Sequence, residues 1–249
     1  MLPGYEIGPR PGRCRMYFRG MAAHPGLAAL RDLQVACRAC HVCVDAGIIP
    51  EANPTFAGEW GAPFFLVGQA PGPAERQTRR PFSGRAGKEL DRWMLRAGFA
   101  SAEEFRHLTY IAALMRCFPG RNRTGTGDLR PPPAAVKNCA HWLDAELELF
   151  QPQVIILVGQ MAIARFLGPG PLEERVGRSF GKDPVMVPLP HPSGQSRWLN
   201  DALNRRRLER ALALIRRLRV SLQQDPKATR ARASARLTAS AVSAAKRRE

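Results

Sequence analysis

Four short apolar runs constrain the fold of this chain more than any other feature. Each is long enough for a buried β-strand and short for a core helix, and stretches with helical spacing separate them. Strands that alternate with helices favour a parallel sheet with helices on both faces. We therefore predict an α/β fold of three layers, in which helices flank a central parallel four-stranded sheet. The strands are expected at residues 64–67, 109–115, 154–158 and 185–189.

The first of these strands runs into an unusual loop in "FFLVGQAPG", residues 64–72. Its two glycines permit close approach of the backbone to a ligand, and Pro71 fixes the turn. The same Val-Gly-Gln recurs in "IILVGQMAI", residues 155–163, where the strand leads directly into a helix, as is typical of scaffold. Ligands of parallel α/β sheets bind beyond the carboxyl ends of the strands. We expect the loops after residues 67, 115 and 189 to converge on one cleft.

The spacing of apolar residues predicts a helix at each end of the domain. Residues 26–39 place Leu30 and Val35 on a mostly one-sided apolar face, and residues 201–220 form an arginine-rich amphipathic helix. Between them, Ser101 is expected to be the N-cap of a short helix because Glu104 follows three residues later. The domain is expected over residues 25–220, with a loose arm over 1–24 and a basic disordered tail over 221–249.

The charge of the chain favours a polyanionic partner. The net charge is +17, and only +5 of it lies in the tail, which holds seven basic and two acidic residues. Nucleic acid is the commonest partner for such a basic chain, and a basic surface without a partner is the alternative. No run of about 18 apolar residues indicates a transmembrane helix. The first twenty residues lack the apolar stretch of a secretory signal, so we expect a cytoplasmic protein.

Clustered cysteines indicate a metal site rather than disulfides in a cytoplasmic chain. Cys40 and Cys43 form a C-x-x-C pair, and folding can bring Cys117 and Cys139 to them. Four thiolates suit tetrahedral zinc or a [4Fe–4S] cluster, and the ligand type alone does not choose between the two. Cys37 and Cys40 make an equally good pair on spacing. Buried structural cysteines without metal are the remaining interpretation.

Four motifs between residues 30 and 215 resemble those of a known family. They are "GQAPGPAE", "RPFSGRAGKELDRWM", "RCFPGRN" and "HPSG", and their order is similar to that in the iron–sulfur uracil-DNA glycosylases, family 4 of the uracil-DNA glycosylase superfamily. The resemblance implies a [4Fe–4S] cluster held by Cys40, Cys43, Cys117 and Cys139, with Cys37 an extra cysteine. It also implies hydrolysis of the bond between a damaged base and deoxyribose, the first step of base excision repair.

The resemblance implies roles for residues around the predicted cleft. His191 in "PHPSG" would donate a hydrogen bond to the leaving base, although taken alone it reads as a surface-loop histidine. Phe82 in "RPFSG" would stack under the flipped base, although a core position is common for phenylalanine. Base contacts are further implied for Gly68, Ala70, Pro71 and Ser193, and DNA-backbone contacts for Arg80, Arg85, Gln195 and Arg197. A solvated basic face is the alternative for the arginines.

Two residues depart from the family pattern. Gln69 replaces the usual glutamate that positions the attacking water, and an amide can orient water but cannot act as a carboxylate base. Glu75 is a possible substitute base, and a solvated loop charge is the competing interpretation. Ala113 stands where the family has an asparagine that contacts uracil, so base preference is open. The long loop "FPGRNRTGTGDLRPPP" adds Arg121 and Arg123 as possible phosphate contacts.

These observations predict a monofunctional DNA glycosylase that acts on uracil or another deaminated base, with His191 and Gln69 as catalytic residues. We expect it to be a monomer with DNA as its partner. No lysine near the motifs is placed as a Schiff-base nucleophile. A catalytically weak or inactive iron–sulfur protein that binds nucleic acid on the same fold is the alternative. An α/β enzyme for free nucleotides is a third possibility, disfavoured by the basic body.

Overall fold

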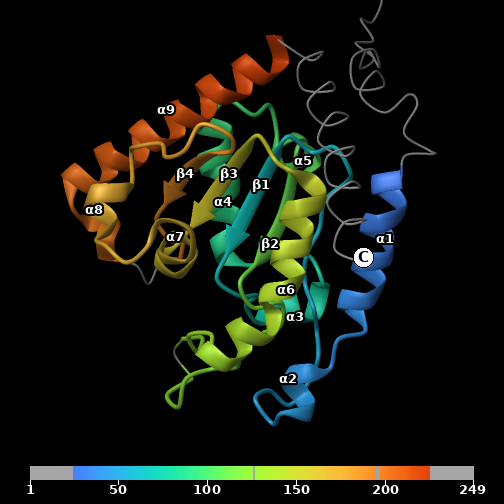
Figure 1. The fold of residues 1–249 in the computed structure, drawn as a ribbon. Coiled ribbons are helices and arrows are strands. Elements are labelled where there is room, and N and C mark those ends of the chain that lie inside the picture. The colour runs from blue at the N-terminus through green and yellow to red at the C-terminus, as the bar shows by residue number, and fades with distance from the viewer. Residues whose placement is uncertain (1–24, 126, 194–196, 225–249) are drawn as a thin grey trace, which may run out of the picture.

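The computed structural model of this chain describes residues 25–125, 127–193 and 197–224 (Figure 1). The expected arm over residues 1–24 lies outside the described residues, and so does Gln195. The expected tail lies outside them too, except for residues 221–224, which continue the last helix.

Four strands form one sheet in the order β2-β1-β3-β4, and every neighbouring pair is parallel. In register, Phe64 of β1 pairs with Thr109 of β2 and with Val154 of β3. The three-layer α/β fold with a parallel four-stranded sheet is therefore confirmed. The strands are β1 Phe64–Gly68, β2 Thr109–Ala113, β3 Val154–Val158 and β4 Val185–Leu189.

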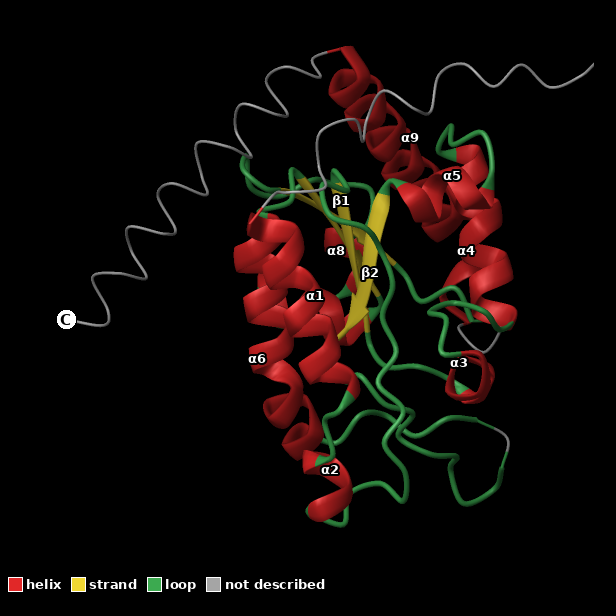
Figure 2. Cartoon of the chain, turned by 90° about the vertical axis from the view of Figure 1, so that its right-hand side faces the viewer, coloured by secondary structure: helices red, strands yellow, loops and turns green. Residues whose placement is uncertain are grey.

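Helices cover both faces of the sheet, so the strands are apolar on both sides (Figure 2). Phe64 and Leu66 pack with residues of α4 and α9 on one face, and the alternating Phe65 and Val67 pack with residues of α1 and α6 on the other. None of the described helices is long and apolar enough to cross a membrane. The helices are α1 Pro25–Arg38, α2 Val42–Asp45, α3 Pro73–Thr78, α4 Arg85–Arg96, α5 Ala102–His107, α6 Pro133–Phe150, α7 Gln160–Leu167, α8 Leu172–Arg175, the 3₁₀ turn η1 Arg197–Asn200, and α9 Ala202–Gln224.

Three expectations for the helices can be compared with the structure: the N-cap of α5, the buried face of α1 and the end of α9. The Ser101 hydroxyl accepts a hydrogen bond from the Glu104 N–H at 3.1 Å, which confirms the N-cap of α5. The expectation for Val35 is wrong. Its side chain is 66% exposed, because α1 turns Leu30 and Cys37 toward the sheet instead. Helix α9 continues to Gln224, beyond the expected end of the domain.

Candidate active site and cysteine pocket

The candidate active site lies where the strand order reverses. The chain passes from β1 to β2 on one side and then crosses to β3 on the other, so the connections that leave β1 and β3 diverge at their carboxyl ends. Ligands of open α/β sheets bind at such a switch point. Gln69 follows β1, Gly159 follows β3 and His191 lies two residues beyond β4.

Gly159 is the point at which Gln69 and His191 meet. It has φ +88°, and a Cβ atom built on it would lie 2.4 Å from Gln69 Nε2 and 3.3 Å from His191 Cδ2. A side chain at this position would displace Gln69, so only glycine leaves the two side chains room. The second Val-Gly-Gln, expected to be scaffold, therefore also forms the wall against which both candidate catalytic residues pack.

His191 is held in one tautomer by its own loop. The Ser193 N–H donates to His191 Nδ1 at 3.2 Å, so Nδ1 is an acceptor and Nε2 carries the proton of the neutral ring. Burial lowers the pKa of His191, which favours this neutral form. The ring can therefore donate a hydrogen bond from Nε2 to a ligand at the strand ends.

The loop after β2 adjoins the loop after β1. The Leu114 N–H donates to the Gly68 carbonyl and the Met115 N–H to the Gln69 carbonyl, both at 3.0 Å. Ala113 pairs with Gly68 in the strand register and is buried. The loops after β1, β2 and β4 thus come together, and Ala113 brings no side-chain donor or acceptor to them.

Phe82 lies beside the end of β1 in an unusual backbone conformation. Its φ of +51° is left-handed, which is uncommon for a bulky residue and often marks a functional position. The half-buried ring lies against Gly68, where a built Cβ would be 3.4 Å from Phe82 Cζ. Gly87 permits the turn, because a Cβ there would lie 1.8 Å from the Phe82 carbonyl oxygen.

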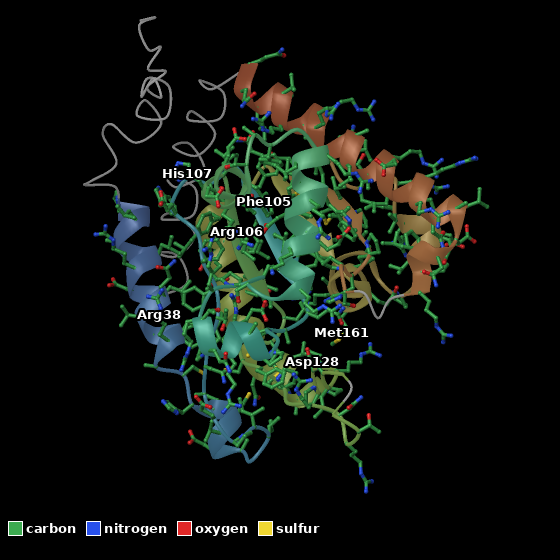
Figure 3. The ribbon with its side chains drawn as sticks, turned by 180° about the vertical axis from the view of Figure 1, so that it is seen from behind. Arg38, Phe105, Arg106, His107, Asp128 and Met161 are labelled. Atoms are coloured by element: carbon green, nitrogen blue, oxygen red, sulfur yellow. The ribbon has the colours of Figure 1, made fainter. Side chains whose placement is uncertain are left out.

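Arg106 of α5, which is labelled in Figure 3 and which sequence reasoning missed, holds this turn in place. Its guanidinium donates to the carbonyl oxygens of Pro81 and Phe82, both at 2.8 Å, and to Asp91 at 3.1 Å. The Arg106 side chain is only 13% exposed. A lone arginine in a short helix carries no motif, so no sequence pattern indicated this role.

Glu75 joins the two loops that carry Gln69 and Phe82. Its carboxylate accepts the N–H of Gly72 at 3.0 Å and the N–H of Gly84 at 2.8 Å, and its side chain is buried. The interpretation of Glu75 as a solvated loop charge is therefore wrong. With both oxygens bound to the backbone, it is a cross-link between the loops rather than a free base.

The arginines expected to contact DNA come from three exposed segments. Two flank the Phe82 turn, two lie on the long loop before α6 and one begins η1; they are Arg80, Arg85, Arg121, Arg123 and Arg197. The long loop before α6 also approaches the loop after β1, since Asp128 Oδ2 lies 3.4 Å from a Cβ built on Gly72. Asp128 is labelled in Figure 3. Burial raises the pKa of Asp128, and the positive charge of Arg121 opposes this shift.

Five cysteines line one pocket beside the end of β2. The four expected ligands are among them: Cys40, Cys43, Cys117 and Cys139. Cys37 is the fifth, but it packs in the core cluster of Leu30 and Phe56, whereas Cys43, Cys117 and Cys139 share a separate small cluster. As they stand, no three of the described His, Cys, Asp or Glu side chains form a ligand group for a metal ion.

The chemistry of this pocket fits a metal–sulfur group. The Asn53 N–H donates to Cys117 Sγ at 3.4 Å and Asn138 Nδ2 to Cys43 Sγ at 3.7 Å, and such contacts stabilise ligating sulfurs. Burial raises the pKa of Cys117 and of Cys139 to about 11, and the neighbouring thiols add to both shifts. The sulfurs thus interact electrostatically, and a bound metal would have to displace their protons.

The family model of the Uracil DNA glycosylase superfamily matches residues 55–216. The chain belongs to this superfamily. It is similar to the type-4 uracil-DNA glycosylase of Thermotoga maritima, with 35% identity over 102 residues, or 41% of this chain and 47% of that protein. The type-4 uracil-DNA glycosylase of Archaeoglobus fulgidus is 34% identical over 110 residues, or 44% and 49% of the two chains.

A type-5 uracil-DNA glycosylase of Thermus thermophilus is 31% identical over 120 residues, or 44% of this chain and 52% of that protein. The chain therefore matches about half the length of these superfamily relatives. The superfamily match includes Gln69, Phe82 and His191 and begins after Cys40 and Cys43. Membership thus covers the candidate active site and two of the four expected cluster ligands.

Proposed function

We propose that this chain is a monofunctional DNA glycosylase that hydrolyses the N-glycosidic bond of uracil or another deaminated base in DNA. The observation that carries the proposal is the meeting of Gln69 and His191 against Gly159. Superfamily membership supports it, because the relatives are named uracil-DNA glycosylases. DNA is the proposed partner, and the exposed arginines around the site support that choice.

Phe82 supplies the face on which the flipped base stacks. A base inside the duplex is out of reach, so it has to leave the helix before its bond to the sugar can be cut. The ring is half-buried and its turn is fastened by Arg106, so it is held in place before the base arrives. Gly68, Ala70 and Pro71 form the adjoining wall of the site, where backbone can approach the base closely.

His191 stabilises the departing base. Cleavage of the glycosidic bond develops positive charge on the sugar and negative charge on an oxygen of the base. A donor aimed at that oxygen binds the transition state more strongly than the ground state. His191 meets this need because its neutral ring carries the proton on Nε2 while Nδ1 accepts from Ser193.

Gln69 orients the attacking water. Its amide contributes both a donor and an acceptor, and a dissociative reaction requires orientation of water more than a strong base. Ala113 leaves the base edge without the side chain that the family uses to read it. The proposed substrates therefore include deaminated bases other than uracil.

The cofactor we propose is a [4Fe–4S] cluster on Cys40, Cys43, Cys117 and Cys139. The shared pocket and the N–H groups directed at two sulfurs support this choice over buried free thiols. When bound, the cluster supplies a covalent cross-link between protein segments and takes no part in the cleavage of the base. The four cysteines then tie the segment after α1 to the exit of β2 and to α6.

We propose that residues 25–220 are the catalytic unit and that the protein acts as a monomer in the cytoplasm. The continuous core around one sheet supports a single unit.

Single-turnover base release tests the proposed function. Excess protein is mixed with duplex and single-stranded oligonucleotides that carry one uracil, hypoxanthine or xanthine, and abasic sites are revealed with alkali. We expect release from at least one of these substrates. His191→Ala should slow release about 10²- to 10³-fold, as expected for loss of a transition-state donor. His141→Ala, at an exposed position on α6, is the matched control and should leave the rate unchanged.

No release from any of these substrates by folded protein that binds the DNA would contradict the proposal. That result would favour the alternative, a protein that binds nucleic acid on this fold without catalysis.

A further inference from the structure

Arg116 is a charged residue buried beside the cysteine pocket. It follows β2 directly before Cys117, and its side chain is 1% exposed. Its Nη2 donates to a Glu146 carboxylate oxygen at 2.5 Å, and the Tyr110 hydroxyl donates to the other oxygen at 2.8 Å. One edge of the guanidinium is thus compensated by a carboxylate that the core also holds.

The rest of this guanidinium has no acceptor. Arg116 Nε and Nη1 are buried, and neither has a hydrogen-bond partner among the described residues. The face of Phe56 lies 5.9 Å from the guanidinium carbon and provides only a weak attraction. Buried charged donors without a partner are costly and rare in native proteins, so they point to an acceptor that occupies the neighbouring space.

The neighbouring space is the cysteine pocket, whose wall includes Arg116. The same pocket is lined by the side chains of five cysteines, Cys139 among them. The unpartnered donors of Arg116 therefore belong to a residue that lines a thiol-rich pocket, and an anionic sulfur-rich group is the acceptor that suits them.

We propose that Arg116 is the charge-compensating residue of this pocket, donating the N–H groups of Nε and Nη1 to the sulfur atoms of the bound cluster while Glu146 limits the positive charge that the cluster experiences. The inference rests on the proposed cofactor and adds to it a determinant of the cluster's stability and reduction potential. Net charge and hydrogen bonds to sulfur set the potential of an iron–sulfur cluster. Arg116 and Glu146 should therefore shift it in opposite directions.

The test is the midpoint potential of the cluster, measured by protein-film voltammetry or by a redox titration followed in the visible spectrum, with iron counted per chain. Arg116→Met removes charge and donors, so it should lower the potential. Glu146→Gln leaves the arginine uncompensated, so it should raise the potential. Arg116→Lys keeps the charge but lacks the planar guanidinium with its several N–H donors, so its midpoint potential should lie between those of wild type and Arg116→Met. Arg165→Met breaks an exposed pair with Asp144 and should change nothing.

Each outcome bears on a separate statement. Wild-type protein that binds no iron overturns the cofactor and the inference with it. If Arg116→Met and Glu146→Gln both bind iron and both have the midpoint potential of wild type, the role of Arg116 is overturned and the proposed cofactor stands. Removing one partner of a buried pair is destabilising. If Arg116→Met does not fold, the opposite shifts of Glu146→Gln and Arg116→Lys decide the question, and shifts of the same sign contradict the inference.

Discussion

The sequence Val-Gly-Gln occurs at the carboxyl ends of two neighbouring strands, β1 and β3, and the two copies have different structures. At the end of β1, Gly68 keeps an ordinary strand conformation and a loop follows, with Pro71 fixing its turn. After β3, Gly159 turns to φ +88° and the chain enters α7 at the next residue. The residues that follow cause the difference, since "APG" cannot continue as a helix and "MAI" can.

The two glutamines have correspondingly different surroundings. Gln160 is exposed and donates to the Gly170 carbonyl at 2.7 Å, whereas Gln69 packs against Gly159 next to His191. The same three residues therefore form a loop with a candidate catalytic amide in one place and a helix start in the other. The comparison teaches that neither copy makes the site alone. The site arises because Gly159 of the second copy leaves room for the side chain of Gln69 of the first.

The largest difference between the two copies is expected when each glycine is replaced by alanine and the rates of base release are compared. At Gly159→Ala the new Cβ would lie 2.4 Å from Gln69 Nε2 in a left-handed backbone, so both Gln69 and His191 must move. We expect base release to slow on the order of 10²-fold, the loss typical of an ångström-scale displacement. At Gly68→Ala the Cβ would lie 3.4 Å from Phe82, an ordinary contact that moves neither Gln69 nor His191, so a smaller loss is expected than at Gly159→Ala. Single-turnover rates and circular dichroism of both variants decide the point, and equal rates would contradict it.

Loss of the Phe82 ring, which lies beside Gly68, should have the next largest effect. The side chains nearest to a Cβ built on Gly159 are those of Gln69 and His191 instead. Phe82→Ala is expected to weaken binding of damaged DNA about 30-fold, from a stacking energy of about 2 kcal/mol per base. Phe82→Trp should retain most of the affinity. Fluorescence anisotropy with uracil-containing and undamaged oligonucleotides separates stacking from backbone contacts. A similar loss for both DNAs would argue against stacking.

The glutamines themselves provide a matched pair. Gln69→Ala should slow base release about tenfold, which corresponds to one hydrogen bond of about 1 to 1.5 kcal/mol to the water. Gln160→Ala should not alter the rate, since its amide bonds only to the surface. Gln69→Glu restores the carboxylate of the family and should support release at least as well as wild type. A wild-type rate for Gln69→Ala would exclude Gln69 from the reaction.

The smallest effect concerns the protonation of His191. Burial holds its pKa below the ordinary 6.5, so the unfolded chain takes up this proton at a higher pH than the folded protein. The free energy of unfolding therefore falls as the pH drops below about 6.5, and it stops falling below the pKa of the folded state. His191→Ala should lack this part of the acid dependence. Urea unfolding at several pH values measures it, and identical slopes for both proteins would contradict the lowered pKa.

The strands and the place of the site could be predicted because both depend on contiguous patterns. The runs over β3 and β4 are apolar throughout, and their observed bounds match the expected residues 154–158 and 185–189. The loops after β1, β2 and β4 were expected to converge because parallel strands end at the same edge. The backbone bonds of Leu114 and Met115 and the packing at Gly159 bring these loops together.

The residues that fasten the site could not be found in this way. From the sequence, Glu75 is only a possible base or a solvated loop charge, and no role is indicated for Arg106 or Arg116, because the burial of a charge depends on partners in other segments, such as Gly84 or Glu146. Helix α3 was missed because its start, "PGP", reads as a turn, although proline fits the first position of a helix. Local patterns do not contain these long-range partners.

The cysteine pocket and His191 are also synthesised in a fixed order. During synthesis the chain leaves the ribosome from its N-terminus, and every cysteine of the pocket precedes residue 140, whereas His191 comes much later. Helix α1, β1, β2 and α6 are thus synthesised before β4 and the loop after it, which carries His191. The proposed cluster ligands are therefore complete before the proposed leaving-group donor exists, so insertion of such a cluster would not have to wait for the candidate active site.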